Sequence, residues 1–273
     1  MPKINIQETI CKTILVKSKL PKVDYVINPY TGCLHACHYC YANYMKKFTQ
    51  HTEPWGKFVD VKINAPQILR QQMKHIQPCS IMMSSVTDPY NQAEKKYKLS
   101  RQILEILLPY QWPMHILTKS DLITRDIDLL QQFKNLRVGF SFFTYKGEDV
   151  KNFEACTPPP QRRIAALQKL DKHDIRTYAF LAPILPHITD LEPLFKALAS
   201  TGIGFVYCDK FNHKTGQREQ VIINIIKDKY PDLWLKFWKD YQNKQYWHKT
   251  AQNIKKLAKM YNIPATIFFG FKT

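Results

Sequence analysis

The feature that most constrains the fold is a regular alternation of short apolar runs with amphipathic segments. The apolar runs have the length and β-branched content of buried strands, and Gly or Pro ends several of them. The segments between them repeat apolar residues at helical spacing. The sequence predicts six strands, at Asp24–Tyr30, Ser80–Val86, Met114–Leu117, Leu136–Phe143, Thr177–Leu181 and Gly204–Cys208. Strands and helices that alternate at this length imply parallel strands with right-handed crossovers. We therefore expect an α/β fold, a partial (β/α)6 TIM-like barrel.

The parts of the chain outside this alternation set the expected organisation. Residues 1–22 are predicted to form an N-terminal arm, residues 23–210 the barrel, and residues 211–273 a basic, mostly helical C-terminal extension packed on it. The extension is expected to hold helices over 221–230 and 233–260 and a last strand over Ala265–Phe271. The segments 49–60 and 144–160 are expected to be irregular, because Pro and Gly interrupt them.

Charge and composition restrict the partners and the compartment. The formal net charge is +18. A surface this positive attracts polyanions, so a nucleic acid or another polyanionic substrate is expected, although a lysine-rich composition without functional meaning is the alternative. No apolar run approaches the length of a membrane span, and the N-terminus has no signal-peptide core, so no membrane association is expected and a cytoplasmic location is predicted.

A cluster of cysteines indicates a metal centre. The chain has seven cysteines, an odd number, and three of them, Cys33, Cys37 and Cys40, follow a C-x3-C-x2-C spacing after the first predicted strand. In a reducing compartment such a cluster indicates metal binding rather than disulfides. A Cys3His zinc site with His35 or His38 is one interpretation, and it would make the chain a zinc-containing nucleic-acid-binding protein without radical chemistry.

The spacing favours an iron–sulfur cluster over zinc. Structural zinc sites usually draw their ligands from two separated pairs, whereas here one loop carries all three cysteines. Three thiolates around a [4Fe–4S] cluster leave one iron without a protein ligand, and S-adenosylmethionine (SAM) is the known partner of such an iron.

The wider motifs resemble the radical SAM superfamily. The string from Asn28 to Ala42, which reads Asn-Pro-Tyr-Thr-Gly-Cys-x3-Cys-x2-Cys-Tyr-Ala, is similar to the branch that contains spore photoproduct lyase and its DNA repair photolyase-like relatives. Further pieces of similarity follow in the same order: Ser85–Tyr90 with Glu94, Leu117–Ser120 with Arg125 and Asp126, Phe140–Ser141, and Ala182–Pro186. The overall pattern resembles the radical SAM mobile pair proteins.

This resemblance implies roles for particular residues. Cys33, Cys37 and Cys40 would bind the cluster. The residues implied at the SAM site are Tyr39, Tyr41, Ser85, Asp88, Lys119, Ser141 and Ala182. The enzyme would cleave SAM reductively, and a 5′-deoxyadenosyl radical would act on a substrate that the sequence does not identify. A reductase or flavodoxin-type electron donor is implied, and a second radical SAM protein is a candidate partner.

One position departs from the resemblance. Spore photoproduct lyase carries a hydrogen-donor cysteine two residues before the serine matched by Ser85, and this chain has Met83 there. A thioether does not donate a hydrogen atom as a thiol does. Cys156 and Cys208 lie near ends of predicted strands, and they are the candidate hydrogen donors. The alternative for each is an ordinary loop or core thiol.

Overall fold

The chain divides into two compact units. A computed structural model describes residues 4–211 and 217–269. The first unit comprises residues 1–36, 41–139 and 172–175, and the second comprises residues 37–40, 140–171 and 176–273. Strand β8 (Leu136–Phe142) gives its first residues to the first unit and its last to the second. The domain bounds expected from the sequence stay a prediction.

Parallel strands form the main sheet of the first unit. Strand β6 (Ile81–Met83) pairs in parallel with β3 (Tyr25–Ile27) on one side and with β7 (Met114–Thr118) on the other. Strand β2 (Leu15–Lys17) adds to β3 in the antiparallel direction. The parallel strands expected near residues 24–30, 80–86 and 114–117 are therefore present, though each of the first two is shorter than its predicted range.

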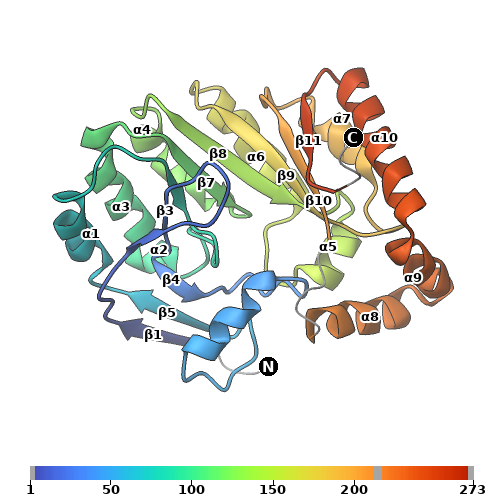
Figure 1. The fold of residues 1–273 in the computed structure, drawn as a ribbon, viewed down its shortest axis with the longest axis horizontal. Coiled ribbons are helices and arrows are strands. Elements are labelled where there is room, and N and C mark those ends of the chain that lie inside the picture. The colour runs from blue at the N-terminus through green and yellow to red at the C-terminus, as the bar shows by residue number, and fades with distance from the viewer. Residues whose placement is uncertain (1–3, 212–216, 270–273) are drawn as a thin grey trace. The chain divides into compact units, whose positions relative to one another are not determined.

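A second, three-stranded sheet of the first unit contains a strand that is not predicted from the sequence. Strand β5 (Phe58–Lys62) lies between β1 (Asn5–Thr9), to which it is parallel, and β4 (Tyr30–Gly32), to which it is antiparallel (Figure 1). The prediction of an irregular segment over 49–60 is wrong at its end, where β5 begins. The predicted strand Asp24–Tyr30 is also divided, because β3 and β4 belong to different sheets on either side of Asn28 and Pro29.

Short helices connect the strands of the first unit. They are the 3-10 helix η1 (Tyr41–Phe48), α1 (Ala65–Met73), α2 (Glu94–Tyr97), α3 (Leu99–Leu107), η2 (Leu108–Tyr110), η3 (Asp121–Asp126) and α4 (Ile127–Leu130). Helix α3 buries Ile103, Leu104 and Leu107, as its apolar spacing predicts. The segment between the second and third predicted strands, where helical spacing is expected, is interrupted at Lys98, whose φ of 51° lies in the left-handed region.

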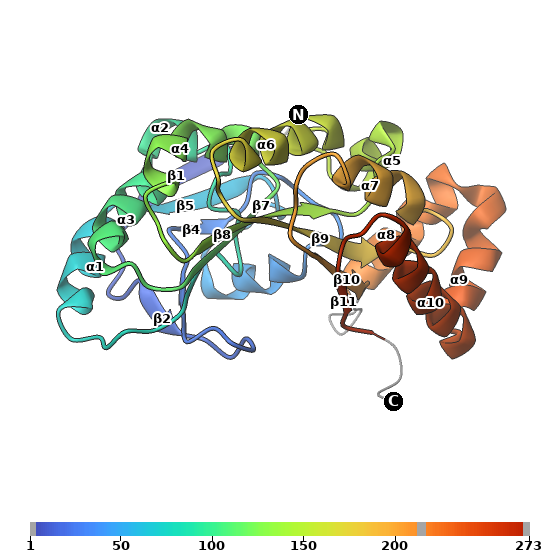
Figure 2. The ribbon, with the colours of Figure 1, turned by 90° about the horizontal axis from the view of Figure 1, so that it is seen from above.

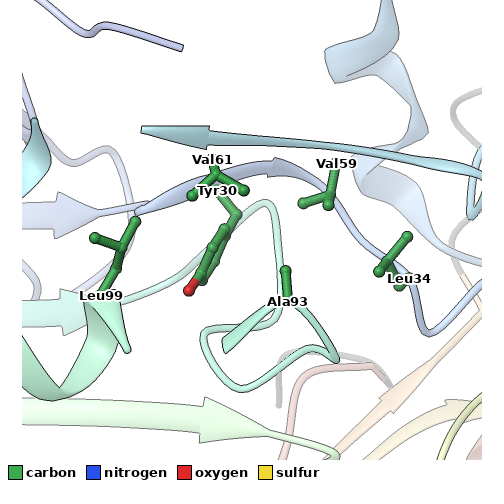
Figure 3. Close-up of a cluster of buried hydrophobic side chains, with 6 residues drawn as sticks. All are labelled: Tyr30, Leu34, Val59, Val61, Ala93 and Leu99. Carbon is green, nitrogen blue, oxygen red and sulfur yellow. The ribbon is translucent and has the colours of Figure 1, made fainter. Parts of the chain in front are cut away.

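A hydrophobic cluster joins the small sheet of the first unit to the loop and helix that follow β6. Figure 3 shows Tyr30 of β4 lying between Leu99 and Ala93. The cluster comprises Tyr30, Leu34, Val59, Val61, Ala93 and Leu99, all of them buried. Full burial of a Val or Leu side chain stabilises the fold by roughly 1.5–3 kcal/mol. The backbone just before the cysteine motif is therefore fixed by core packing.

The strands of the second unit are parallel as well. Strand β10 (Val206–Lys210) lies between β9 (Thr177–Ile184) and β11 (Ala265–Ile267). Strand β9 extends beyond its predicted end at Leu181. Most of its side chains are buried, which is typical of a strand covered on both faces. The predicted last strand ends early, and its positions 270 and 271 lie outside the described residues.

Helices of the second unit pack on one another and on these strands. They are α5 (Gly147–Phe153), α6 (Pro160–Asp171), α7 (Leu191–Leu198), α8 (Gln217–Lys229), η4 (Pro231–Leu233), α9 (Trp234–Gln242) and α10 (Lys244–Met260). Helix α10 runs beside α7 and β11 (Figure 2). The prediction of a loop over 144–160 is wrong, since α5 lies within it. The helix predicted over 233–260 divides at Asn243, whose side chain caps α10 by accepting from the Gln245 amide at 2.9 Å.

None of the helices in the described part of the chain is both long and apolar enough to cross a bilayer.

Candidate functional site

The three clustered cysteines lie on the loop that follows β4. Cys33 belongs to the first unit, and Cys37 and Cys40 belong to the second. Cys33 and Cys37 are buried, Cys40 is half-buried, and none of the three forms a disulfide. Gly32 precedes Cys33 with a φ of 84°, and a Cβ at Gly32 would lie 2.6 Å from the carbonyl oxygen of Phe58. The loop therefore requires glycine immediately before its first thiol.

The three cysteine thiols are chemically suited to bind an iron–sulfur cluster. Thiolates are the usual protein ligands of such clusters, and this loop supplies three of them within eight residues. Within residues 4–211 and 217–269, no three His, Cys, Asp or Glu side chains are grouped as a ready metal site. The assignment of Cys33, Cys37 and Cys40 as ligands therefore stays a prediction.

Backbone pairing holds the second part of the loop against the end of α5. Cys37 forms an antiparallel bridge with Glu154, and the His38 amide donates to the Phe153 carbonyl at 2.8 Å. The Cys40 amide donates to the Cys37 carbonyl at 3.2 Å, which closes a tight turn. The segment Cys37–Cys40 is thus fixed within the second unit by α5, an element that the sequence analysis missed.

A buried ion pair supports the same segment through Tyr39. The Tyr39 hydroxyl donates to Glu154, and its ring meets Phe143 edge to face at 5.7 Å. Burial, together with the Glu154 carboxylate, raises the pKa of Tyr39 well above its usual range, so the hydroxyl stays protonated and donates. Arg163 is 1% exposed and forms an ion pair with Glu154.

Arg163 extends this support to β8. Its guanidinium donates to the Ser141 carbonyl at 2.8 Å and to the Thr157 hydroxyl at 2.7 Å. Ser141, a predicted SAM residue, is therefore connected through Arg163 and Glu154 to the cysteine segment. Neither Glu154 nor Arg163 was identified from the sequence, where both resemble ordinary surface charges.

Two predicted SAM residues of the first unit are brought together. The Tyr41 hydroxyl donates to the Ser85 carbonyl. The side-chain oxygen of Asn28 accepts from the amides of Ser85 and Val86 at 2.9 and 3.1 Å. Asn28 opens the Asn-Pro-Tyr motif, so the motif fixes the loop after β6 by accepting its backbone amides.

Asp88 contacts protein groups at the end of β7. Its carboxylate accepts from the Thr118 hydroxyl at 2.7 Å and from the Lys119 amide at 2.8 Å, and it lies 3.2 Å from the His35 ring. Burial opposes ionisation of Asp88, but the charge of His35 and these hydrogen bonds outweigh it and lower the pKa to about 2. We infer that Asp88 positions Lys119 and the loop that carries His35.

A second buried network contains several more of the residues that carry the resemblance. Glu94 and Asp126 are fully buried, and Arg125 forms an ion pair with each at 2.7 Å. The hydroxyl of Tyr30 donates to Glu94, and that of Tyr90 donates to Asp126 at 3.1 Å. These motif residues therefore hold the first unit together.

The two candidate hydrogen-donor cysteines differ in solvent exposure. Cys156 is exposed in the turn after α5, whereas Cys208 is fully buried in β10. Burial, with Asp209 nearby, raises the pKa of Cys208 to about 12. Ala182 is half-buried in β9, and Met83 is fully buried in β6. Cys156 is thus the more accessible thiol of the two, and its role stays a prediction.

Comparison with known families identifies the chain. The model of the radical SAM superfamily matches residues 27–196, which is more than half of the chain. The chain belongs to the radical SAM superfamily. It is therefore an enzyme, and membership implies that it uses SAM with an iron–sulfur cluster. The resemblance inferred from the cysteine motif is confirmed.

Two relatives illustrate the similarity of this chain to known proteins. An uncharacterised protein of Methanocaldococcus jannaschii, MJ0683, is 40% identical over 190 residues, which cover 70% of this chain and 71% of the relative. Spore photoproduct lyase of Bacillus subtilis is 26% identical over 181 residues, which cover 64% of this chain and 50% of the lyase.

A solved structure shares the fold. A mutant of spore photoproduct lyase with bound AdoMet and dinucleoside spore photoproduct superposes with a TM-score of 0.71 at 17% identity, covering 97% of this chain and 82% of the lyase chain. The predicted fold class, a partial (β/α)6 barrel with a mostly helical C-terminal extension, is confirmed.

Proposed function

We propose that this protein cleaves SAM reductively at a [4Fe–4S] cluster held by Cys33, Cys37 and Cys40. When bound, such a cluster supplies the electron that breaks a carbon–sulfur bond of SAM and yields a 5′-deoxyadenosyl radical. The observation that carries the proposal is the three-cysteine loop in a chain of this superfamily, with its segment Cys37–Cys40 fixed by Glu154 and Phe153.

The chain's own residues have separable tasks in this proposal. Cys33, Cys37 and Cys40 bind the cluster, and Tyr39 anchors their loop on Glu154. Ser85, Lys119, Ser141 and Ala182 contact SAM at the ends of β6, β7, β8 and β9, and Tyr41 fixes the Ser85 backbone. Asp88 keeps the Lys119 backbone in place by accepting its amide hydrogen.

A nucleic acid is the substrate class that we favour. The formal net charge of +18 supports a polyanionic partner, and the similar lyase structure holds a dinucleoside spore photoproduct. By the resemblance to spore photoproduct lyase, Met83 stands at the position of a hydrogen-donor cysteine, so repair of the same lesion by the same hydrogen donor is not part of the proposal. Cys156, the accessible thiol, is the proposed donor if a hydrogen atom is returned.

The remaining partners follow from the chemistry. One electron must enter for each SAM cleaved, so we propose a reductase or a flavodoxin-type donor, and a second radical SAM protein as a candidate partner. The predicted cytoplasmic location agrees with such donors.

Metal analysis with spectroscopy tests the proposal against the zinc alternative. Anaerobically reconstituted protein should contain iron and sulfide in a ratio near that of a [4Fe–4S] cluster. After reduction with dithionite it should give an electron paramagnetic resonance signal that changes when SAM is added. Alanine at Cys33, Cys37 or Cys40 should remove the iron, whereas alanine at Cys79, outside the loop, should not. One zinc without iron or sulfide would instead establish the zinc-containing protein.

A further inference from the structure

Arg218 reaches the cysteine loop from a distant part of the chain. It lies in the first turn of α8, and its Nη1 donates to the carbonyl oxygen of His38 at 3.1 Å. His38 stands between Cys37 and Cys40, and all four residues belong to the second unit. The C-terminal extension therefore contacts the segment that carries two of the three cysteines.

The contact places a permanent positive charge beside two thiols. Burial, the largest effect, lowers the pKa of Arg218, whereas the nearby Cys37 and Cys40 raise it. A guanidinium stays ionised across the physiological range, so the charge persists. No carboxylate in the described part of the chain forms an ion pair with Arg218, whereas the charge of Arg163 is offset by Glu154.

One hydrogen-bond donor of Arg218 indicates that an acceptor binds beside it. Its Nε is buried and has no hydrogen-bond partner among the described residues. Native proteins rarely leave a buried N–H without an acceptor. Sulfur atoms of an iron–sulfur cluster and of its thiolate ligands accept hydrogen bonds, and such bonds are among the factors that set a cluster's reduction potential.

We propose that Arg218 is a positioning residue that holds the Cys37–Cys40 segment and raises the reduction potential of the cluster bound there. This inference rests on the proposed function. Reduction adds one negative charge to the cluster, and a nearby cation in a site of low dielectric stabilises that charge. Arg218 thereby makes the electron easier to deliver from the external donor.

α8 is held in place independently of this contact. It packs against α5, and Tyr230, just after its end, donates to Asp149 of α5 at 2.6 Å and accepts from Asn152 at 3.0 Å. Phe153 stacks on the Tyr230 ring at 6.0 Å. A substitution at Arg218 should therefore leave the helix in position and change mainly the charge near the cysteines.

A redox titration of charge variants tests the inference. The midpoint potential of the reconstituted cluster is measured by electron paramagnetic resonance in the wild type, Arg218→Gln, Arg218→Lys and the control Lys229→Gln, which removes an exposed charge near the other end of α8. At a fixed ambient potential, Arg218→Gln should lower the ratio of reduced to oxidised cluster about tenfold, which is about 59 mV for one electron. Arg218→Lys should shift the potential less, and Lys229→Gln should not shift it.

The outcomes separate this inference from the proposed function. A wild type without an iron–sulfur cluster contradicts the proposed function itself. A wild type with a cluster and an unchanged midpoint in Arg218→Gln contradicts only the role of Arg218. If Arg218→Gln retains too little iron for titration, the Arg218→Lys variant decides. The inference requires Arg218→Lys to keep its cluster. Equal iron loss in both variants overturns the inference.

Discussion

Glu154 connects the cysteine segment to the core of the second unit. Its carboxylate is buried and accepts from Tyr39, Thr157 and Arg163. Removing one partner of a buried ion pair leaves the other charge uncompensated, at a cost of about 3 kcal/mol or more. We expect Glu154→Gln to lower the free energy of unfolding by about 3 kcal/mol, measured by urea denaturation, and to reduce iron uptake.

Glu148→Gln is the matched control for this prediction, because Glu148 is exposed on the same helix, α5. It should change stability by less than about 0.5 kcal/mol. Equal stability of the two variants would show that Glu154 does not hold the loop.

Asp88 makes the stability of the first unit depend on pH. Its folded-state pKa of about 2 is below the ordinary value of 3.8. A lowered carboxyl pKa stabilises the fold above the unfolded-state pKa, and that stabilisation is lost as pH falls from about 4 to about 2. We expect Asp88→Asn to lower the free energy of unfolding by about 2 kcal/mol near neutral pH, with the difference from wild type shrinking below about pH 4.

Urea unfolding curves at several pH values measure this difference, with the exposed Asp228→Asn as control. A difference between wild type and Asp88→Asn that stays constant down to about pH 3 would contradict the assigned role of the carboxylate.

Residues with a local signature could be predicted from the sequence, whereas residues whose role depends on tertiary contacts could not. The cysteines stood out because of their spacing, and Tyr39, Ser85 and Lys119 because they lie in motifs. Arg163 and Arg218 lie among other polar residues, and nothing near them signals burial or a partner far along the chain. Such contacts become visible only when the fold is known.

At the scale of elements, the junction of α2 and α3 shows how local conformation divides a predicted helix. Lys98 ends α2 in the left-handed region, at a φ of 51°. Glycine adopts this conformation without the steric cost that a side chain carries. We therefore expect Lys98→Gly to raise the free energy of unfolding by about 0.5–1 kcal/mol, measured by thermal or urea unfolding.

Lys95→Gly serves as the comparison, since Lys95 is exposed within α2 and has ordinary helical geometry. It should lower stability by about 1 kcal/mol. The same sign of effect at both positions would contradict the conformational argument.

Elements with strong periodicity were predicted well, and elements stabilised by pairing were not. α3 and α7 follow their apolar spacing, whereas β5 depends on pairing with β1 and β4, which are distant in sequence. The local sequence of β5 follows Pro54 and Gly56 and therefore resembled a loop. Helix α5 is short and polar at its start, so it gave no periodic signal.

At the scale of the whole molecule, the positive charge bears on the substrate. If a nucleic acid binds, Lys and Arg side chains displace counterions from its phosphates, and affinity falls as salt rises. We expect binding of a short fluorescent single-stranded DNA to weaken roughly tenfold between about 50 and about 200 mM salt, measured by fluorescence anisotropy. An uncharged peptide nucleic acid of the same sequence is the control. A DNA affinity that does not change with salt concentration would argue against a nucleic-acid substrate.

The most direct test of the central claim is the product formed from SAM. Reconstituted protein is incubated anaerobically with SAM and dithionite, and the products are separated by liquid chromatography with mass detection. The account predicts 5′-deoxyadenosine and methionine from the wild type, and none from a protein with alanine at Cys33, Cys37 and Cys40. Two results would contradict the proposed reaction. One is the absence of 5′-deoxyadenosine when the wild-type protein carries a full cluster. The other is a product that results from cleavage of a different C–S bond of SAM.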